Sequence, residues 1–305
     1  MEIVFGDLSL GVRKGGAEYI FAYNTGGLES LRKGSREFVF RRPDLAFWRA
    51  TTDNDRGCGF SARSSVWMGA DRFFKVENYS VTADGTLLRW DELIAPANNS
   101  LIDSPLRKAS SVSIRFAYST VTKPEAEVFV TYSLSEEGSG LRVDYEYRGT
   151  EGLPGLPVCG LRFTLPFPVD SFDWEGLSGE TYPDRMWSAQ EGAFHHEGAE
   201  ICPYVMPQEY GMHMRTRRLT MHVRKDSLSV SAVTNEGFNF SLLPNSPHEL
   251  ENAWHSIELP AYRRSYLTIA AAVRGVGGID SWGSDVGERW QIDAAGTYRT
   301  SFVIE

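Results

Sequence analysis

The sequence predicts an all-β protein built from antiparallel sheets. Apolar and polar residues alternate with a period of two, as expected for strands with one buried face. Pairs of turn-forming residues recur at short intervals, among them Gly15-Gly16, Asp84-Gly85 and Glu236-Gly237. Many short strands separated by such turns are typical of sandwiches and barrels. The alternating stretches are 111–117, 127–132, 141–147, 219–223, 228–233 and 298–304.

Two of these strands are expected to pair as a hairpin. Residues 127–132 and 141–147 flank the turn-rich run Glu136-Glu137-Gly138-Ser139-Gly140. Residues 266–273 form a further apolar, strand-like stretch. The polar run that follows Phe47-Trp48 predicts a loop, tied down by side-chain to backbone hydrogen bonds.

Helices are expected at only two places. The first is predicted to begin after Ser246, an N-cap residue, with Pro247 in its first turn and Glu249 completing a capping box. It is expected to continue from Leu250 to Trp254. A second helix of one or two turns is predicted from Asp184 to Gln190. The chain carries neither a Gly-rich nucleotide-binding motif nor a low-complexity linker. One β domain over residues 1–305 is the simplest organisation.

The composition is that of a globular protein and argues against nucleic-acid-binding and membrane proteins. Of the 305 residues, 42% are hydrophobic and 23% are charged, which is ordinary for a globular protein. The net charge of -9 argues against nucleic acid and anionic membranes as partners. No apolar run reaches the ~20 residues of a membrane span, and Met1 to Leu10 lacks a signal-peptide pattern.

Cysteine usage favours a reduced compartment. Cys58, Cys159 and Cys202 are far apart and fit no C-x-x-C spacing. A zinc site at Cys202 with His195 and His196 is disfavoured, because no second cysteine stands near. We therefore expect a cytoplasmic protein without a metal site of its own.

The run Gly277-Gly278-Ile279-Asp280-Ser281-Trp282-Gly283 is the most unusual segment. It follows the stretch 266–273 and places a large aromatic ring in a glycine-rich loop. An exposed tryptophan is a flat apolar platform with one N–H donor, which suits the C–H face of a sugar. The alternative is a core aromatic that caps the edge of the sheet.

Four further clusters are too unusual for ordinary sheet residues. The first three are Phe47 to Gly57, Gly176 to Arg185 and Pro203 to Gly211. The fourth consists of Phe238 to Ser241, followed by Pro247 to Leu250 and Glu258 to Pro260. Taken in order with the Trp282 run, these clusters resemble the C-terminal domain of LacZ-type β-galactosidases of glycoside hydrolase family 2. That domain also occurs as the small chain of two-chain β-galactosidases. The resemblance covers nearly the whole chain and implies an antiparallel supersandwich similar to galactose mutarotases.

The resemblance assigns Trp282 to substrate binding, with Gly278, Asp280 and Ser281 shaping its loop. It implies no catalytic residue and no metal ligand here, because the catalytic glutamates and magnesium ligands of the family lie on a TIM-barrel domain. This chain is too short to hold that barrel beside the β domain. The remaining matched residues are expected to be structural: Trp48, Arg49, Asp53, Asn54, Asp55, Glu180, Tyr182, Asp184, Arg185, Gln208 and Glu209.

Several positions depart from the family pattern. Ile279 replaces an acid, Thr51 replaces a proline, and Arg218 stands where a tryptophan is usual. These changes indicate a divergent member and leave the preferred sugar open.

Three functions fit these observations. The first is a non-catalytic small subunit or C-terminal domain that completes the site for a β-galactoside on a large catalytic subunit. Such a chain is expected to expose an apolar surface for its partner, or to self-associate through it. The second is an independent hexose mutarotase or epimerase, with its acid and base among His195, His196, His213 and Glu209. The third is a free-standing carbohydrate-binding module.

Overall fold

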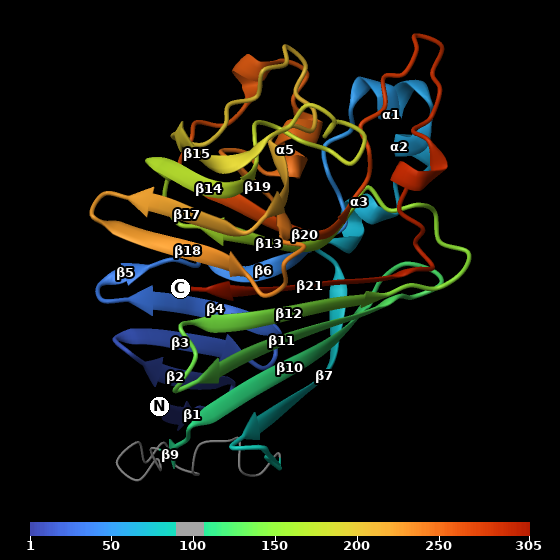
Figure 1. Ribbon diagram of the computed structural model, residues 1–305. Helices are drawn as coiled ribbons and strands as arrows, with labels where there is room; N and C mark the ends of the chain where they lie inside the picture. Colours follow the sequence, from blue (N-terminus) through green and yellow to red (C-terminus); the bar gives the residue numbers. More distant parts are fainter. Residues whose placement is uncertain (90–106) are drawn as a thin grey trace.

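The strands form three antiparallel sheets in the computed structural model, which describes residues 1–89 and 107–305 (Figure 1). The prediction of an all-β antiparallel protein is confirmed. No helix in the described part of the chain is long and apolar enough to cross a membrane.

The largest of the described sheets has ten strands, in the order β15-β14-β17-β18-β21-β12-β11-β10-β7-β8. Its middle is an antiparallel meander in which β10, β11 and β12 pair with neighbours along the chain. The C-terminal strand β21 joins the two halves by pairing with both β12 and β18. The strands are β7 (Phe74–Ala83), β8 (Thr86–Leu87), β10 (Ser111–Thr120), β11 (Glu127–Ser135), β12 (Leu141–Arg148), β14 (Ser171–Leu177), β15 (Glu191–Glu197), β17 (Arg218–Val223), β18 (Asp226–Ala232) and β21 (Thr297–Ile304).

Two smaller sheets accompany it. The first has the order β5-β4-β3-β2-β1-β9, and the second has the order β16-β19-β20-β13-β6. The first contains β1 (Glu2–Phe5), β2 (Ser9–Lys14), β3 (Ala17–Ala22), β4 (Gly27–Lys33), β5 (Arg36–Glu37) and β9 (Arg107–Lys108). The second contains β6 (Arg41–Ala46), β13 (Val158–Leu165), β16 (Met212–Thr216), β19 (Phe238–Leu243) and β20 (Ser265–Val273).

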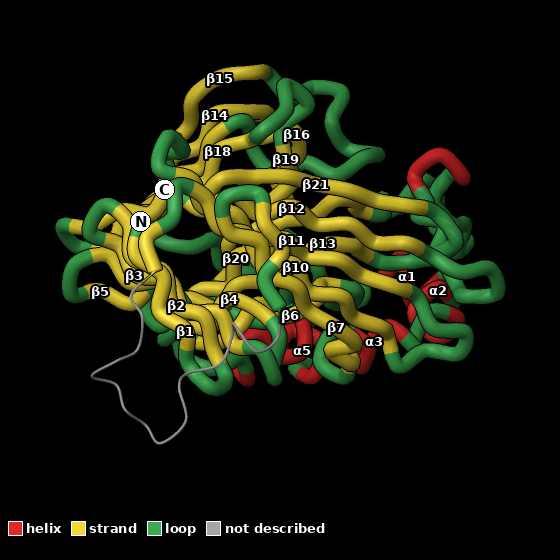
Figure 2. Tube along the Cα trace, turned by 90° about the horizontal axis from the view of Figure 1, so that it is seen from below, coloured by secondary structure: helices red, strands yellow, loops and turns green. Residues whose placement is uncertain are grey.

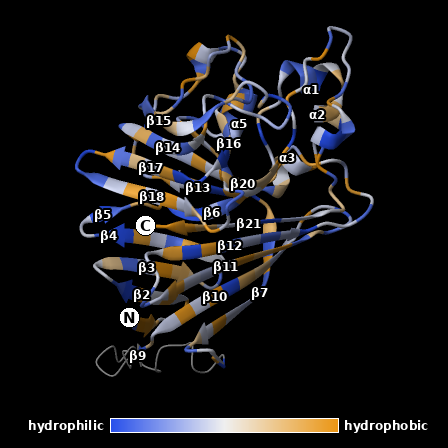
Figure 3. Ribbon diagram, viewed as in Figure 1, coloured by the Kyte–Doolittle hydropathy of each residue, from blue (hydrophilic) through white to orange (hydrophobic). Residues whose placement is uncertain are grey.

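The alternating stretches lie in strands, as predicted, except that Val233 falls just beyond the end of β18. In β11, buried residues alternate with partly exposed ones along nearly the whole strand. Bands of hydrophobic and hydrophilic residues accordingly cross the large sheet (Figure 3). The predicted hairpin is present, with Val128 opposite Tyr147 and Tyr132 opposite Val143.

One hydrophobic cluster draws on all three sheets. Phe21 of β3 contacts Tyr132 of β11 with ring centroids 5.3 Å apart, which joins the first small sheet to the large one. Phe163 of β13 contacts Phe302 of β21 at 6.1 Å, which joins the second small sheet to the large one. In two perpendicular views, both termini lie on the side of the molecule away from α1 and α2 (Figures 1 and 2).

The predicted helix after Ser246 is α5 (Pro247–Asn252), and its capping box with Glu249 is present. The helix predicted from Asp184 to Gln190 is wrong, because that segment forms only turns. Two short 3-10 turns, η2 (Ser256–Glu258) and η3 (Glu288–Trp290), follow later in the chain.

The loop predicted after Trp48 is wrong for residues 53–57. Helices α1 (Asp53–Gly57), α2 (Phe60–Arg63) and α3 (Trp67–Ala70) follow one another there. The physical reason is a second capping box. The Thr52 hydroxyl accepts the Asp55 N–H, and the Asp55 carboxylate accepts the Thr52 N–H.

Candidate functional site

Trp282 lies on the loop that follows β20, and 92% of its surface is exposed. This exposure excludes the alternative of a core tryptophan. Gly277, Gly278 and Gly283 have φ values of 73°, 78° and 80°, a region that side chains rarely adopt. The loop therefore depends on glycine to turn tightly and present the ring.

Asp280 organises the turn that carries the ring. Its Oδ1 accepts hydrogen bonds from the backbone N–H groups of Trp282, at 2.9 Å, and Ser284, at 3.3 Å. The Ser284 hydroxyl donates to the other carboxylate oxygen. These bonds lower the pKa of Asp280, the one from the Ser284 hydroxyl most strongly. Ser281 and Ile279 are exposed beside the ring.

The base of the loop is held by residues from two other clusters. Asp184 accepts the backbone N–H of Val276 at 3.0 Å and that of Gly277 at 2.8 Å, one on each carboxylate oxygen. The guanidinium of Arg185 donates to the Gly277 carbonyl. The Asn54 amide donates to the Val276 carbonyl at 2.9 Å. Every polar backbone group of Val276 and Gly277 is thereby fixed by a side chain.

A buried ion pair fixes the strand end just before the loop. Arg49 donates to the carbonyls of Arg274 and Gly275 at 2.8 and 2.9 Å, and pairs with Asp55 at 3.1 Å. Arg274 in turn pairs with Asp285 on the far side of the loop. Because Arg49 and Asp55 are both buried, removing Asp55 would leave the buried Arg49 charge without its ion-pair partner.

The third cluster, Pro203 to Gly211, contacts both of the other two clusters. Gln208 accepts the backbone N–H of Asp53 at 2.8 Å and donates to its carboxylate at 3.4 Å. The Glu180 carboxylate accepts the backbone N–H of Gly211 at 2.6 Å. These bonds join the second and third clusters to each other and the third to α1.

Glu209 is a buried acid of this region whose environment strongly disfavours its charge. The Tyr182 hydroxyl donates to its carboxylate at 3.3 Å. Burial raises the pKa of Glu209 to about 7, and the positive charges of Arg49 and Arg162 only partly oppose this effect. Arg162 also donates to the backbone carbonyl of Trp48 at 2.7 Å, so the first cluster is anchored to β13.

The first three clusters and the Trp282 run therefore meet at one end of the molecule, although they are far apart in the sequence. In Figure 1 the Trp282 loop rises beside α1 and α2. The contacts that join the clusters run mostly through side chains to backbone groups, which fixes loop geometry and leaves the Trp282 ring in solvent.

The acid and base candidates for mutarotase chemistry have separate partners. His195 on the exposed strand β15 contacts carboxylates of the same sheet at 2.7 and 3.2 Å. The neighbouring His196 faces the Gly198 carbonyl at 3.3 Å. The buried His213 pairs with Glu200 at 3.1 Å, and Glu209 bonds to a tyrosine hydroxyl.

The three cysteines are free, and the nearest polar partner of the Cys202 thiol is the Tyr204 carbonyl at 3.9 Å. Among the residues that the structure describes, no three His, Cys, Asp or Glu side chains are grouped to hold a metal ion.

Comparison with known proteins identifies the family. The sequence profile described as "Beta galactosidase small chain" matches residues 13–304. The chain belongs to the β-galactosidase small-chain family. The β-galactosidase small subunit of Latilactobacillus sakei is 43% identical, over 96% of this chain and 94% of that protein.

Longer β-galactosidases also match this small chain. That of Streptococcus thermophilus is 29% identical over 100% of the chain, and β-galactosidase BgaC of Bifidobacterium adolescentis is 31% identical over 96%. The small chain covers only 28% and 26% of these two proteins. Among solved structures, a putative aldose 1-epimerase from Escherichia coli K12 aligns over 97% of this chain and 98% of its own, with 12% identity and a TM-score of 0.44.

The small chain exposes further large apolar side chains on the loops near this end. Ile201, Val205, Trp254 and Ile257 are each more than two-thirds exposed. Their two segments touch, because the Ser256 N–H donates to the Val205 carbonyl at 2.8 Å. Exposed apolar groups gathered in this way are typical of a surface that contacts another protein.

Sequence analysis of the small chain missed Arg274 and Asp285, which brace the Trp282 loop from both sides. A signal for Arg274 was present, since a charged residue ends the apolar stretch of β20 directly before a glycine. An arginine in that place is buried only when its charge is met by acids. Asp285 carries no such signal in the sequence.

Proposed function

We propose that this chain is a non-catalytic small subunit, or the equivalent C-terminal part, of a β-galactosidase of the family 2 type. Trp282 forms one wall of its sugar site. The ring offers an apolar face for the C–H groups of a galactoside and an N–H donor at its edge. The observation that carries the proposal is an almost fully exposed tryptophan on a loop whose base is held in place by residues of two other sequence clusters.

The rigidity of the loop supports this role. A binding residue contributes most when its position is set before the ligand arrives, because ordering it on binding costs free energy. Asp184 and Asp280 fix the backbone on both sides of Trp282 through charge-assisted bonds. A solvent-exposed tryptophan with no ligand would need no such bracing.

The catalytic acids belong to a partner in this proposal. A retaining glycosidase needs two carboxylates about 5–5.5 Å apart that flank the scissile bond. We assign these glutamates, and the magnesium ion that accompanies them in the family, to a large subunit or domain. The exposed apolar loops around Val205 and Ile257 support docking of that partner or of a second copy of the chain.

Reconstitution tests the proposal. Hydrolysis of a nitrophenyl galactoside is measured with this chain alone, with a β-galactosidase large chain alone, and with both together. We expect activity only from the mixture, together with a complex of the two chains on size-exclusion chromatography.

The controls separate assembly from catalysis. Asp7→Asn alters an exposed turn between β1 and β2, and should leave both complex and activity unchanged. Hydrolysis by this chain alone at the rate of the mixture would refute the assignment of the catalytic acids to a partner.

A further inference from the structure

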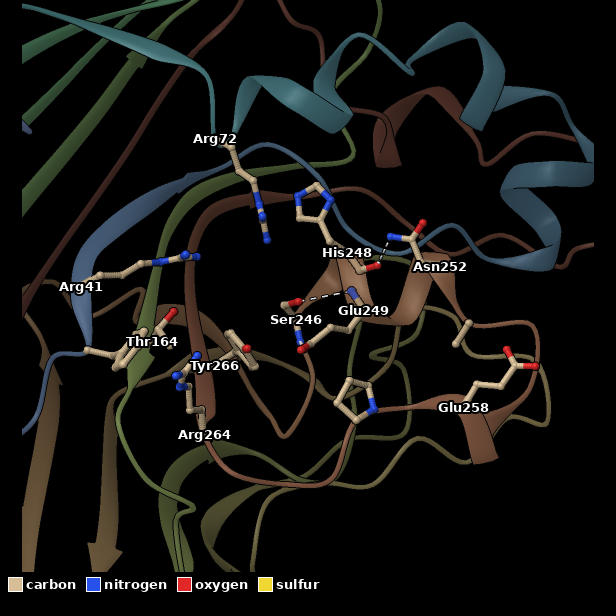
Figure 4. A pocket seen from close by; sticks show the side chains of 13 residues that line it. Arg41, Arg72, Thr164, Ser246, His248, Glu249, Asn252, Glu258, Arg264 and Tyr266 are labelled. Carbon is tan, nitrogen blue, oxygen red and sulfur yellow. Dashed lines mark hydrogen bonds between the residues drawn. The ribbon is translucent and has the colours of Figure 1, made fainter.

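A cavity lies away from the Trp282 loop, between α5, β6, β13 and β20. Its volume is about 430 Å³, within the range of sites for small organic ligands. Figure 4 shows the side chains of Arg41, Arg72 and Arg264 reaching toward it from three different segments. An accumulation of guanidinium groups is unusual in a chain of net charge -9.

The arginines retain unused donors. In the described part of the chain, the Arg72 guanidinium has no hydrogen-bond or ion-pair partner. Arg264 lies over the Phe40 ring at 3.6 Å from its centroid, which leaves the N–H groups in the guanidinium plane free. Arg41 pairs with Asp44 through only one of its nitrogens, at 2.6 Å.

The two carboxylates at the cavity are already engaged by their own segments. Glu249 accepts the backbone N–H of Ser246 at 2.7 Å in the α5 capping box. Glu258 accepts the backbone N–H of Trp254 at 2.8 Å. His248 turns its Nε2 to the buried carboxylate of Asp71 at 2.8 Å. The cavity is therefore richer in free donors than in free acceptors.

The residues that line the cavity favour a ligand with a negative charge and with a face that can pack against apolar side chains. Guanidinium groups bind phosphate and carboxylate through paired N–H donors, with geometry that neutral groups cannot match. Phe40, Pro260 and Tyr266 add apolar and aromatic surface, while Thr164 and Asn252 add hydroxyl and amide groups. This combination suits a hydroxylated ring that carries an anionic group.

We infer that this cavity is a binding site for an anionic sugar derivative, a sugar phosphate or a sugar acid, held by Arg72 and Arg264. The site is separate from Trp282 and does not depend on the function proposed for that residue. Arg72 lies in the turn that follows α3, and Arg264 lies in the segment before β20.

Calorimetric titration of the full chain tests the inference with four probes: galactose 6-phosphate, galacturonate, galactose and inorganic phosphate. We expect at least one charged sugar to bind about tenfold more tightly than galactose, as a charge-assisted contact should contribute. The comparison of the two charged sugars distinguishes a phosphate from a carboxylate ligand. Inorganic phosphate should compete if the phosphate ester is the tighter of the two.

Matched variants identify the groups responsible. Arg72→Gln and Arg264→Gln each remove an exposed guanidinium, and should weaken binding of the charged sugar by about tenfold. Arg289→Gln removes the same charge from the exposed turn η3, and should change affinity less than twofold, as should Trp282→Ala. Failure of both charged sugars to bind at about 10 mM would overturn the inference. Equal effects of Arg72→Gln and Arg289→Gln would overturn it as well.

Discussion

Substitution of Asp184 tests whether its carboxylate holds the base of the Trp282 loop. The carboxylate is buried and accepts two backbone N–H groups, from Val276 and Gly277, at 3.0 and 2.8 Å. Asp184→Asn keeps the size of the side chain. It leaves one carbonyl acceptor and turns an NH2 group toward one of the two backbone donors.

The expected cost follows from the bond that is lost. A hydrogen bond from a backbone donor to a charged acceptor contributes about 1.5–3 kcal/mol, and the Gly277 donor is buried and finds no water in its place. The cost falls on the loop, because both bonds to the Asp184 carboxylate come from backbone groups at the base of that loop. Since 1.4 kcal/mol corresponds to a factor of ten, local opening should become about ten- to a hundredfold more frequent.

Hydrogen exchange measures this opening directly. The amides of residues 276–284 should exchange about ten- to a hundredfold faster in Asp184→Asn, while those of β11 and β12 keep their rates. Asp7→Asn serves as the matched control, in an exposed turn. If exchange in residues 276–284 is the same in both variants, the carboxylate does not hold the loop.

Two further predictions concern pH and backbone strain. Because burial raises the pKa of Glu209 from 4.5 to about 7, the folded chain keeps a proton that the unfolded chain releases between these values. The free energy of unfolding should therefore fall by about 3 kcal/mol from pH 4.5 to pH 7 through this group, and Glu209→Gln should remove that part of the slope in urea titrations; equal slopes would refute it. Gly283→Ala should lower the melting temperature more than Gly85→Ala, because both have positive φ but a Cβ at Gly283 would lie 2.8 Å from the Gly57 carbonyl oxygen, whereas Gly85 faces open space. Equal losses would show that only backbone conformation matters.

The strands were predictable because alternation is a local signal. In β11 and β12 each inward residue meets the core and each outward one is more exposed, so the period of two appears in the sequence. Which strands would be neighbours was not predictable. The pairing of β21 with β12 and β18 joins segments far apart in the chain, and no local pattern encodes it.

The short helices also show that a local pattern predicts an element only when the pattern does not depend on distant residues. The capping box at Ser246 was found because a proline and a glutamate follow it. The equivalent box at Thr52 uses Asp55, whose carboxylate also meets Arg49. An aspartate in a run of polar turn formers is typical of a loop. Only the fold shows that Asp55 is buried and pairs with Arg49.

The residues of the site could be predicted from the sequence, but their arrangement in space could not. The clusters, including Asp184 and Arg185, were recognisable from their sequence motifs. Their convergence on the backbone of Val276 and Gly277 depends on tertiary structure, as does the burial of Arg274.

The activity of Trp282→Ala in the reconstituted enzyme shows whether this ring forms a wall of the sugar site. Loss of the ring should remove about 1.5–3 kcal/mol of contact with the sugar and lower kcat/KM about ten- to a hundredfold. Formation of the two-chain complex should be unchanged, and Trp187→Ala, at another exposed tryptophan outside the apolar surface, should retain most of the activity. Full activity of Trp282→Ala in an intact complex would show that the ring does not contribute to the sugar site.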